Sequence, residues 1–200
     1  EKKAKLFDPD NTHNVEQLLY NLSLENSLVV QHLNTTKASL LTRLKASRAN
    51  RNTIYWLNLY FLAQDIHEQA TSNYLHYENI HQNFSRTDLI YRIQKNIHLQ
   101  ARHCEQLAQC IIQRQSFQIH PDHEMILNNL ENSLQEWIEQ NPQNLEVKNL
   151  LLVFNNLRNV QAQFKNLSIE QESYQQSYTR HQDNLNLLDD DIHGVDDLWL

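Results

Sequence analysis

The sequence predicts an all-α protein: an elongated antiparallel bundle of about five helices, several of them long, with an acidic flexible C-terminal tail. Its 200 residues include one glycine, Gly194, where an average soluble protein would have roughly fourteen. Only three prolines interrupt the chain, and apolar residues recur at steps of three and four over long stretches. Because tight hairpins and phosphate-binding loops rely on glycine, long helices joined by few breaks are what remains.

The first predicted helix follows a linker at residues 1–11 and runs from Thr12, a suitable N-cap, to Ala46. Basic residues crowd the end of this helix, from Lys37 to Arg51. They either complement the helix dipole or form an edge that meets anionic lipid headgroups. The apolar residues that define its inner face are Val15, Leu18, Leu22, Val29, Leu33, Leu40 and Leu44.

The second and third helices are predicted over residues 52–82 and 86–115. The stretch from Ile54 to Ile66 is apolar nearly all round, so we expect it to lie at the centre of the packing. The third helix carries a seam with a mean step of about 3.5 residues, made by Ile90, Ile93, Ile97, Cys104, Leu107 and Ile111.

A connection at residues 116–121 precedes a shorter helix that begins at Asp122 and stops before Pro142. The last helix, predicted over residues 144–178, has the most regular seam, which either belongs to the core or forms an oligomer interface. Its members are Leu150, Val153, Leu157, Val160, Phe164 and Leu167. The bundle domain therefore spans residues 12–178, and residues 179–200 form an acidic tail or linker.

Composition excludes some classes of protein and favours others. The net charge of −7 argues against a general nucleic-acid binder, which needs a basic face. Cys104 and Cys110 lie on one predicted helix but point to different faces, so they cannot form a disulfide with each other. No stretch reaches the roughly 18 apolar residues of a membrane span. Both ends look like boundaries inside a longer protein.

The histidines, eleven in number, raise the question of a metal site, but their spacing does not support one. A di-iron bundle needs Glu-x-x-His on two helices, and the useful instance is the single step from Glu78 to His81. Thr71 stands where a zinc-protease helix would need a second histidine. His120 and His123 lie in a connection and make a poor rigid pair. We predict no metal and no cofactor, with the histidines solvated on helix surfaces.

Catalytic residues are not predicted either. His103 and Cys104 are adjacent on a helix and therefore about 100° apart, so they do not face one another. No glycine-built turn exposes a nucleophile. We predict that the protein is not an enzyme.

A polar turn directly follows the most apolar stretch and consists of Gln64, Asp65, His67 and Glu68. Asp65 and Glu68 share one helix face. Because a buried carboxylate needs a partner, Asp65 is expected to pair with an arginine of another helix and set the register. The alternative is a polar pocket for a ligand.

Four segments carry a resemblance to a known family: NLSLENSLVV at residues 21–30, YFLAQDIHE at 60–68, KASLL at 37–41 and RTDLIYRIQ at 86–94. Over about residues 12–170 the chain resembles the soluble region of the YccS-like inner-membrane proteins, within the fusaric-acid-resistance (FUSC) group of aromatic-acid exporters. The resemblance implies two blocks of membrane helices elsewhere in the polypeptide and a soluble region on the cytoplasmic face of the bacterial inner membrane. It implies no catalytic residues.

We therefore predict a non-enzymatic cytoplasmic domain of a FUSC/YccS-type transporter for the efflux of aromatic acids or related compounds, acting in assembly or gating. Its predicted partners are the membrane part of the same polypeptide and further copies of itself. A ligand-sensing module for aromatic carboxylates or lipid headgroups is one alternative, a coiled-coil adaptor between proteins is another, and a metal-using bundle enzyme is a third. The basic residues expected to contact a ligand or headgroup are Arg43, Arg48, Arg86 and Arg92.

Overall fold

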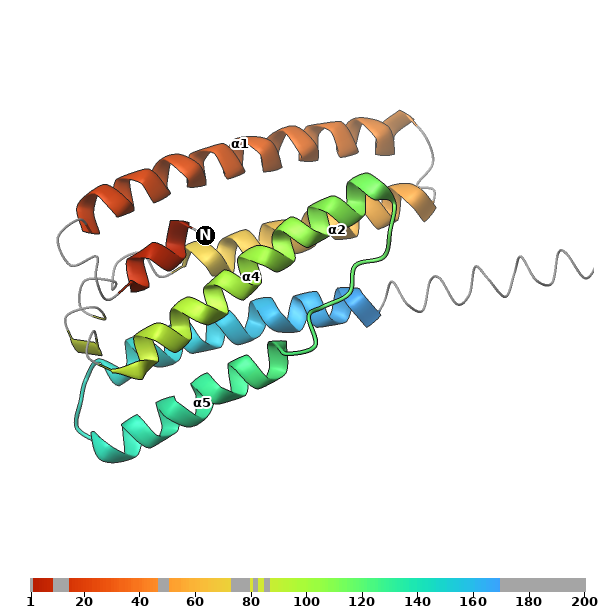
Figure 1. Ribbon diagram of the computed structural model, residues 1–200. Coiled ribbons are helices and arrows are strands. Elements are labelled where there is room, and N and C mark those ends of the chain that lie inside the picture. Colours follow the sequence, from red (N-terminus) through yellow and green to blue (C-terminus); the bar gives the residue numbers. More distant parts are fainter. Residues whose placement is uncertain are drawn as a thin grey trace, which may run out of the picture.

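A computed structural model describes residues 2–8, 15–46, 51–72, 80, 83–84 and 87–169. These residues contain helices, turns and loops and no strand, which confirms the all-α prediction. The elements are a short 3-10 helix η1 (Lys2–Phe7), the helices α1 (Val15–Ala46), α2 (Arg51–Thr71), α4 (Asp88–Gln113) and α5 (His123–Gln140), and a last helix described over residues 147–169 (Figure 1).

Several predictions fall on segments outside the described residues. The acidic tail at residues 179–200 is one of them, and the end of the last predicted helix, at residues 170–178, is another. The predicted helix start at Thr12 and the step from Glu78 to His81 also lie outside the described residues.

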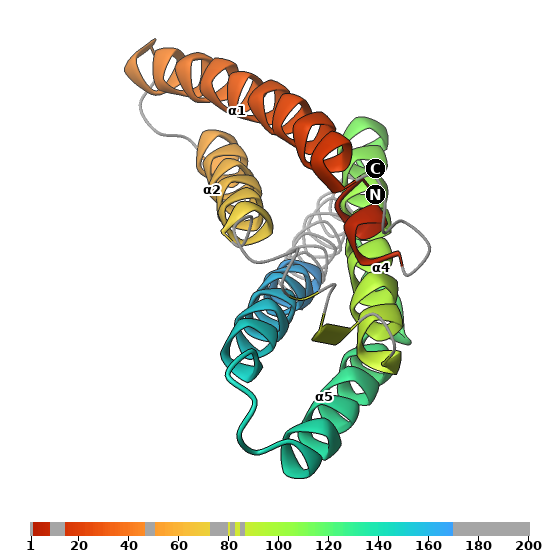
Figure 2. The ribbon, with the colours of Figure 1, turned by 90° about the vertical axis from the view of Figure 1, so that its left-hand side faces the viewer.

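The helices form an antiparallel bundle. Successive helices reverse direction along the chain, and α4 and the 147–169 helix occupy its middle (Figure 1). Viewed nearly along the helix axes, α1 and α2 lie on one side of the two middle helices and α5 lies on the opposite side (Figure 2). The α4 helix packs on α5 and η1, whereas α1 packs on α2 and η1.

The larger of two hydrophobic clusters joins η1 to the first half of α4, to α5 and to the start of the 147–169 helix. Ile90 of α4 is buried here beside Leu150 and Val153, and the rings of Phe84 and Trp137 meet edge to face at 4.8 Å. Apolar residues at the start of α1 pack against this cluster. The α4 helix therefore contacts most of the elements that share this core.

A second cluster lies where α2 meets the end of α4 and the 147–169 helix. Phe164 and Phe117 are fully buried in it, with ring centroids 5.7 Å apart. Phe117 belongs to the connection between α4 and α5, so this connection contributes to the core. All the seam residues predicted on the last helix are buried, which confirms them as core: Leu150, Val153, Leu157, Val160, Phe164 and Leu167.

Two segments differ from what the sequence suggested. The η1 segment lies within the stretch assigned to a linker, and its Ala4, Leu6 and Phe7 are buried in the larger cluster. The α2 helix was expected at the centre of the packing, and this expectation was wrong. Its Ile54 and Phe61 are 46% and 51% exposed, because the described elements cover only one side of α2.

Side-chain amides connect helices to backbone carbonyls at several points. Gln100 of α4 donates to the carbonyl of Leu157 at 2.7 Å. Gln161 donates to the carbonyl of His123 at 3.1 Å. Both bonds join segments that are distant in sequence, so amides help to hold the 147–169 helix in register with α4 and with the start of α5.

Candidate functional site

A cavity of about 160 Å³ lies between η1, α2, α4 and the 147–169 helix. Its walls are mostly apolar, and Ile66, Ile97 and Val160 come from three different helices. An apolar protein cavity of about this size can hold one benzene-sized molecule. The cavity is therefore large enough for a single small apolar group.

One polar edge of this cavity is formed by Lys3 of η1. The Nζ atom of Lys3 donates a hydrogen bond to the carbonyl oxygen of Ala70 at 2.7 Å. Burial lowers the pKa of Lys3 to about 8, because a buried ammonium loses its hydration. The lysine ties η1 to the end of α2 and places an amine beside apolar walls.

A wider groove of about 660 Å³ runs between α1 and α2. Trp56 and Tyr60 of α2 form its aromatic side, and Leu33 and Leu40 of α1 also line it. Arg43, one of the four basic residues predicted to contact a ligand, lines the same groove. Aromatic rings beside a guanidinium group are a combination that suits a flat, anionic molecule.

The polar turn of α2 lies on the helix surface. Asp65 and Glu68 are exposed, and Gln64 donates to a carboxylate oxygen of Glu68 at 3.0 Å, one turn away. Burial lowers the pKa of His67, and the neighbouring Glu68 opposes this effect. Asp65 is exposed, which removes the reason for a buried arginine partner, and among the described residues it forms no inter-helix ion pair.

The other predicted basic residues do not join Arg43. Arg92 forms an ion pair with Asp88 of the same helix at 2.6 Å, on the surface of α4. Arg48 and Arg86 lie outside the described residues. Within the described part of the chain, one predicted basic residue therefore lines a groove and another forms a local helix pair.

A cluster of three histidines contradicts in part the expectation that the histidines are solvated, because His103 and His123 are buried. The ring centroid of His103 lies 5.3 Å from that of Phe164. Its Nε2 atom accepts a hydrogen bond from the backbone N–H of His120 at 3.3 Å, and Nδ1 of His123 donates to the carbonyl of His120 at 2.7 Å. Burial, with His123 and His120 nearby, lowers the pKa of His103 to about 4. The cluster fastens the connection between α4 and α5 onto the core while His103 is neutral.

The signal that could have revealed this cluster is a seven-residue interval along α4. Leu89, Asn96 and His103 follow one another at that interval and are all buried. Residues seven apart share one helix face, so the apolar Leu89 marks the side on which the two polar residues lie. The seam predicted for this helix passes through Cys104 instead, and Cys104 is exposed.

Among the described residues, no three His, Cys, Asp or Glu side chains are grouped as a metal ion would require. Over the described residues, no helix combines the length and the apolar content that a membrane-spanning segment requires.

Comparison with known proteins relates the chain to inner membrane proteins. A profile of the FUSC-like family, described as "FUSC-like inner membrane protein yccS", matches residues 1–164. The inner membrane protein YccS of Escherichia coli K12 is 36% identical over 200 residues, which is all of this chain and 28% of that protein. An uncharacterized protein of Haemophilus influenzae is 36% identical over 106 residues, which is 53% of this chain and 15% of that protein. No solved structure matches the chain.

The family match covers most of the chain, and the chain spans less than a third of the length of either curated relative. The all-helical bundle, the length of the match and the identity over the whole chain agree with the resemblance found in the sequence. The chain therefore belongs to the FUSC-like family of YccS-type inner membrane proteins.

Proposed function

We propose that the chain is a non-enzymatic domain at the cytoplasmic face of a transporter-type inner membrane protein, where it assembles or gates the membrane-embedded part of the same polypeptide. The membership in a membrane-protein family supports a transport-related role. The chain corresponds to 28% of the E. coli relative, which leaves the larger part of such a polypeptide for other tasks.

The observation that carries the assembly role is a pair of large apolar side chains left exposed on α2. Ile54 and Phe61 lie on one exposed face, which also carries Asn58 and Asp65, and α2 contains the most apolar stretch of the sequence. Soluble proteins rarely leave large apolar side chains grouped on one face unless another surface covers them. A helix that packs on α1 and on the second cluster with one side, and still leaves Ile54 and Phe61 exposed on the other, is suited to join this bundle to a second module.

The assembly role is tested in the full-length protein by changing Phe61 to lysine. Efflux of a panel of aromatic carboxylic acids from overproducing cells should fall, because a charge would oppose the contact between α2 and the membrane part. The isolated chain should melt as before, since Phe61 is half exposed. Met125→Lys on α5, also at an exposed apolar position, serves as the matched control. If both variants and the unchanged protein show equal efflux, the proposed contact between α2 and the membrane part is wrong.

The position relative to the membrane is tested by labelling. A single cysteine is placed at Met125 in a full-length protein from which Cys104, Cys110 and any other cysteines have been removed. It should react with a membrane-impermeant maleimide in inverted vesicles and not in intact cells. The reverse pattern would place the domain on the opposite face.

Ligand sensing is a second candidate, favoured by the α1–α2 groove that Arg43 lines with Trp56 and Tyr60. Titration with aromatic carboxylates should then raise the melting temperature of the chain. A ligand at a hundred times its dissociation constant adds roughly 2.7 kcal/mol of stability. The rise should shrink in Arg43→Gln and persist in Arg102→Gln, a substitution on the exposed face of α4. A melting temperature that does not change at millimolar ligand would contradict ligand sensing and leave assembly as the one proposed role.

A further inference from the structure

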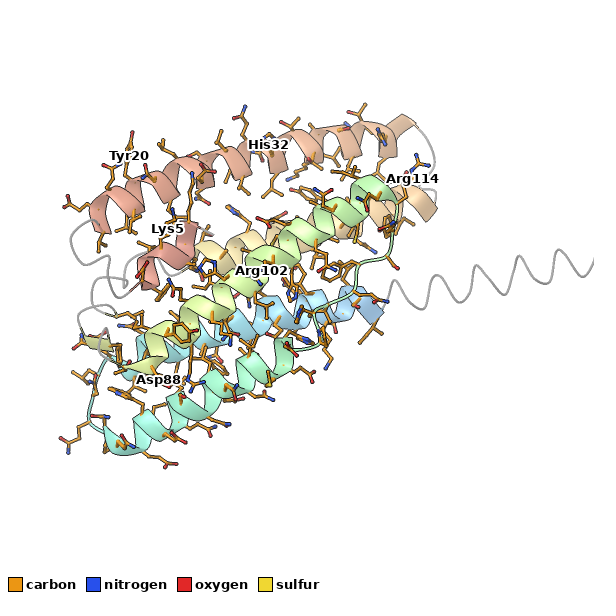
Figure 3. The ribbon with its side chains drawn as sticks, viewed as in Figure 1. Lys5, Tyr20, His32, Asp88, Arg102 and Arg114 are labelled. Atoms are coloured by element: carbon orange, nitrogen blue, oxygen red, sulfur yellow. The ribbon has the colours of Figure 1, made fainter. Side chains whose placement is uncertain are left out.

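The outer face of α1 is an unusual surface for a helix in water. Figure 1 shows α1 along the edge of the bundle, and Tyr20 lies on this helix (Figure 3). Tyr20, Leu24 and Leu41 are 60%, 49% and 44% exposed. Large apolar side chains are therefore presented over most of the length of α1.

These residues belong to a regular seam, which we call the outer seam. Its members follow steps of three and four, and every one of them is exposed. Such a seam is the pattern by which one helix packs along another. At 1.5 Å per residue it extends for about 42 Å. The outer seam consists of Gln17, Tyr20, Leu24, Ser27, Gln31, Asn34, Ala38, Leu41 and Lys45.

The outer seam carries no charge before Lys45, its last member. A solvent-facing side of a helix is normally rich in charged residues. The hydroxyl of Ser27 donates to the carbonyl of Ser23 at 3.1 Å, and beside the seam the hydroxyl of Thr35 donates to the carbonyl of Gln31 at 3.0 Å. Because these hydroxyls are already bonded within α1, covering this face leaves few polar groups without partners.

The charges of α1 are separated along its length, and this determines which orientation of a second α1 helix fits. Glu16 lies at its start, whereas Lys37 and Lys45 lie in its last third, and all three are exposed. Glu25 pairs with Lys2 of η1 and Arg43 lines the groove against α2, so these two charges face the bundle. Two parallel copies would place like charges at the same level. Two antiparallel copies place Glu16 of each helix near the basic end of the other, and their helix dipoles are then aligned in opposite directions, which is favourable.

One antiparallel register also matches side chains of similar kind. It sets Leu24 against Leu41 of a second copy and Ser27 against Ala38. In the same register the amide of Gln31 lies level with the amide of Asn34. At these three levels apolar groups meet apolar groups, small residues meet small residues and amides meet amides. The same register sets Tyr20 level with Lys45, a pairing of an aromatic ring with a cation, and twofold symmetry repeats each pair.

We propose that the outer seam binds the outer seam of a second copy of this chain, in an antiparallel twofold pair with Leu24 beside Leu41. This proposal rests on the assembly role proposed above and identifies the surface through which two copies of the chain associate. It uses the outer side of α1, so α2 keeps its own exposed face for the membrane part.

The orientation is tested by cysteine cross-linking in the 200-residue chain with Cys104 and Cys110 changed to serine. Leu24→Cys and Leu41→Cys, each alone, should give little covalent dimer under mild oxidation. A mixture of the two variants should give a dimer that contains one chain of each. If Leu24→Cys cross-links to itself and the mixture adds nothing, the helices are parallel and the proposal is wrong.

The association itself is measured by sedimentation over a range of concentrations. Leu24→Arg should weaken the dimer by about a hundredfold or more, because the symmetric pair would take up two buried charges. Met125→Arg, an equivalent change at an exposed site on α5, should leave the dissociation constant unchanged. Circular dichroism and melting curves of both variants establish that any loss of dimer is not a loss of fold.

Other outcomes overturn the proposal in recognisable ways. If the chain sediments as a monomer at all concentrations and gives no cross-link, the proposed twofold pair is wrong. A monomer that binds vesicles of anionic lipid, with Leu24→Arg lowering that binding, would assign the outer seam to a lipid surface. If the chain is monomeric and Phe61→Lys still lowers efflux, the proposed outer-seam dimer is wrong and the proposed contact of α2 with the membrane part is supported. If the chain forms the predicted dimer and Phe61→Lys does not change efflux, the outer-seam dimer is supported and the proposed contact of α2 with the membrane part is wrong.

Discussion

The 147–169 helix and α1 were predicted from the same three-and-four spacing, yet the structure uses them differently. All the predicted seam residues of the 147–169 helix are buried, and its outer side carries charges such as Arg158 and Lys165 together with the partly exposed Leu152. Of the inner-face residues predicted on α1, only Leu40 is fully buried. Spacing therefore identifies an apolar face, while the charge on the opposite face indicates whether that helix lies at the true surface of an assembly.

The largest expected effect tests the core side of this comparison. Phe164→Ala should lower the free energy of unfolding by about 3–5 kcal/mol, because the ring is fully buried and packs against Phe117 and His103. Urea denaturation measures the loss. Phe61→Ala on α2 removes the same ring from a half-exposed site and should cost far less. Similar losses at the two sites would contradict the division between core and uncovered helix faces.

The next effect concerns pH and the histidine cluster. The pKa of His103 is about 4 in the folded chain and 6.5 as its ordinary value, so between these values the unfolded chain binds a proton that the folded chain does not. The free energy of unfolding should fall by up to about 3 kcal/mol as pH decreases through this window. Melting curves of His103→Gln should show a flatter pH dependence, and His98→Gln, at an exposed site on α4, should keep it. A drop of the same size in both variants would assign the effect to other groups.

Two neighbouring leucines sharpen the comparison within α1 itself. Leu40→Ala should destabilise the chain by about 2–3 kcal/mol, since Leu40 is 7% exposed and lines the contact with α2. Leu41→Ala should change the stability of the monomer by less than about 0.5 kcal/mol, because its side chain faces outward. Thermal or urea unfolding at low protein concentration measures both, and equal losses would mean that α1 is packed on two sides within one copy.

The smallest expected effect is at Asp65. An inter-helix ion pair with a buried arginine would make Asp65→Ala cost about 3 kcal/mol. The exposed position seen here predicts a change within about 0.5 kcal/mol, as for most surface substitutions. A loss of about 3 kcal/mol in the unfolding curve would instead support an ion pair between Asp65 and a buried arginine.

Much of the fold could be predicted because a long helix repeats the pattern of its buried face many times. The seam from Leu150 to Leu167 repeats the same step often enough to identify the core, and Ile90, Ile93 and Ile97 do so on α4. Short segments lack such repetition. Phe117 and the η1 residue Phe7 are buried by tertiary contacts, and nothing periodic in their neighbourhood indicates it.

The candidate site was harder to predict than the fold. The turn at Gln64–Glu68 was expected to be internal because apolar residues precede it, but the described elements leave one side of α2 uncovered and Asp65 is exposed there. The groove that Arg43 lines depends on how α1 and α2 meet, and neither sequence segment alone reveals that meeting. His103 was overlooked because a polar residue on a buried face is recognised only when the three-dimensional neighbours are known.

The amide contacts of Gln100 and Gln161 have a consequence for how the bundle responds to its surroundings. Amide groups do not titrate, and their hydrogen bonds to Leu157 and His123 carry no net charge that dissolved ions could screen. The register of the central helices should therefore stay the same across wide changes in ionic strength. A protein built this way can alter its charged surface, or lose an ion pair such as that between Lys165 and Glu124, without shifting one helix along another.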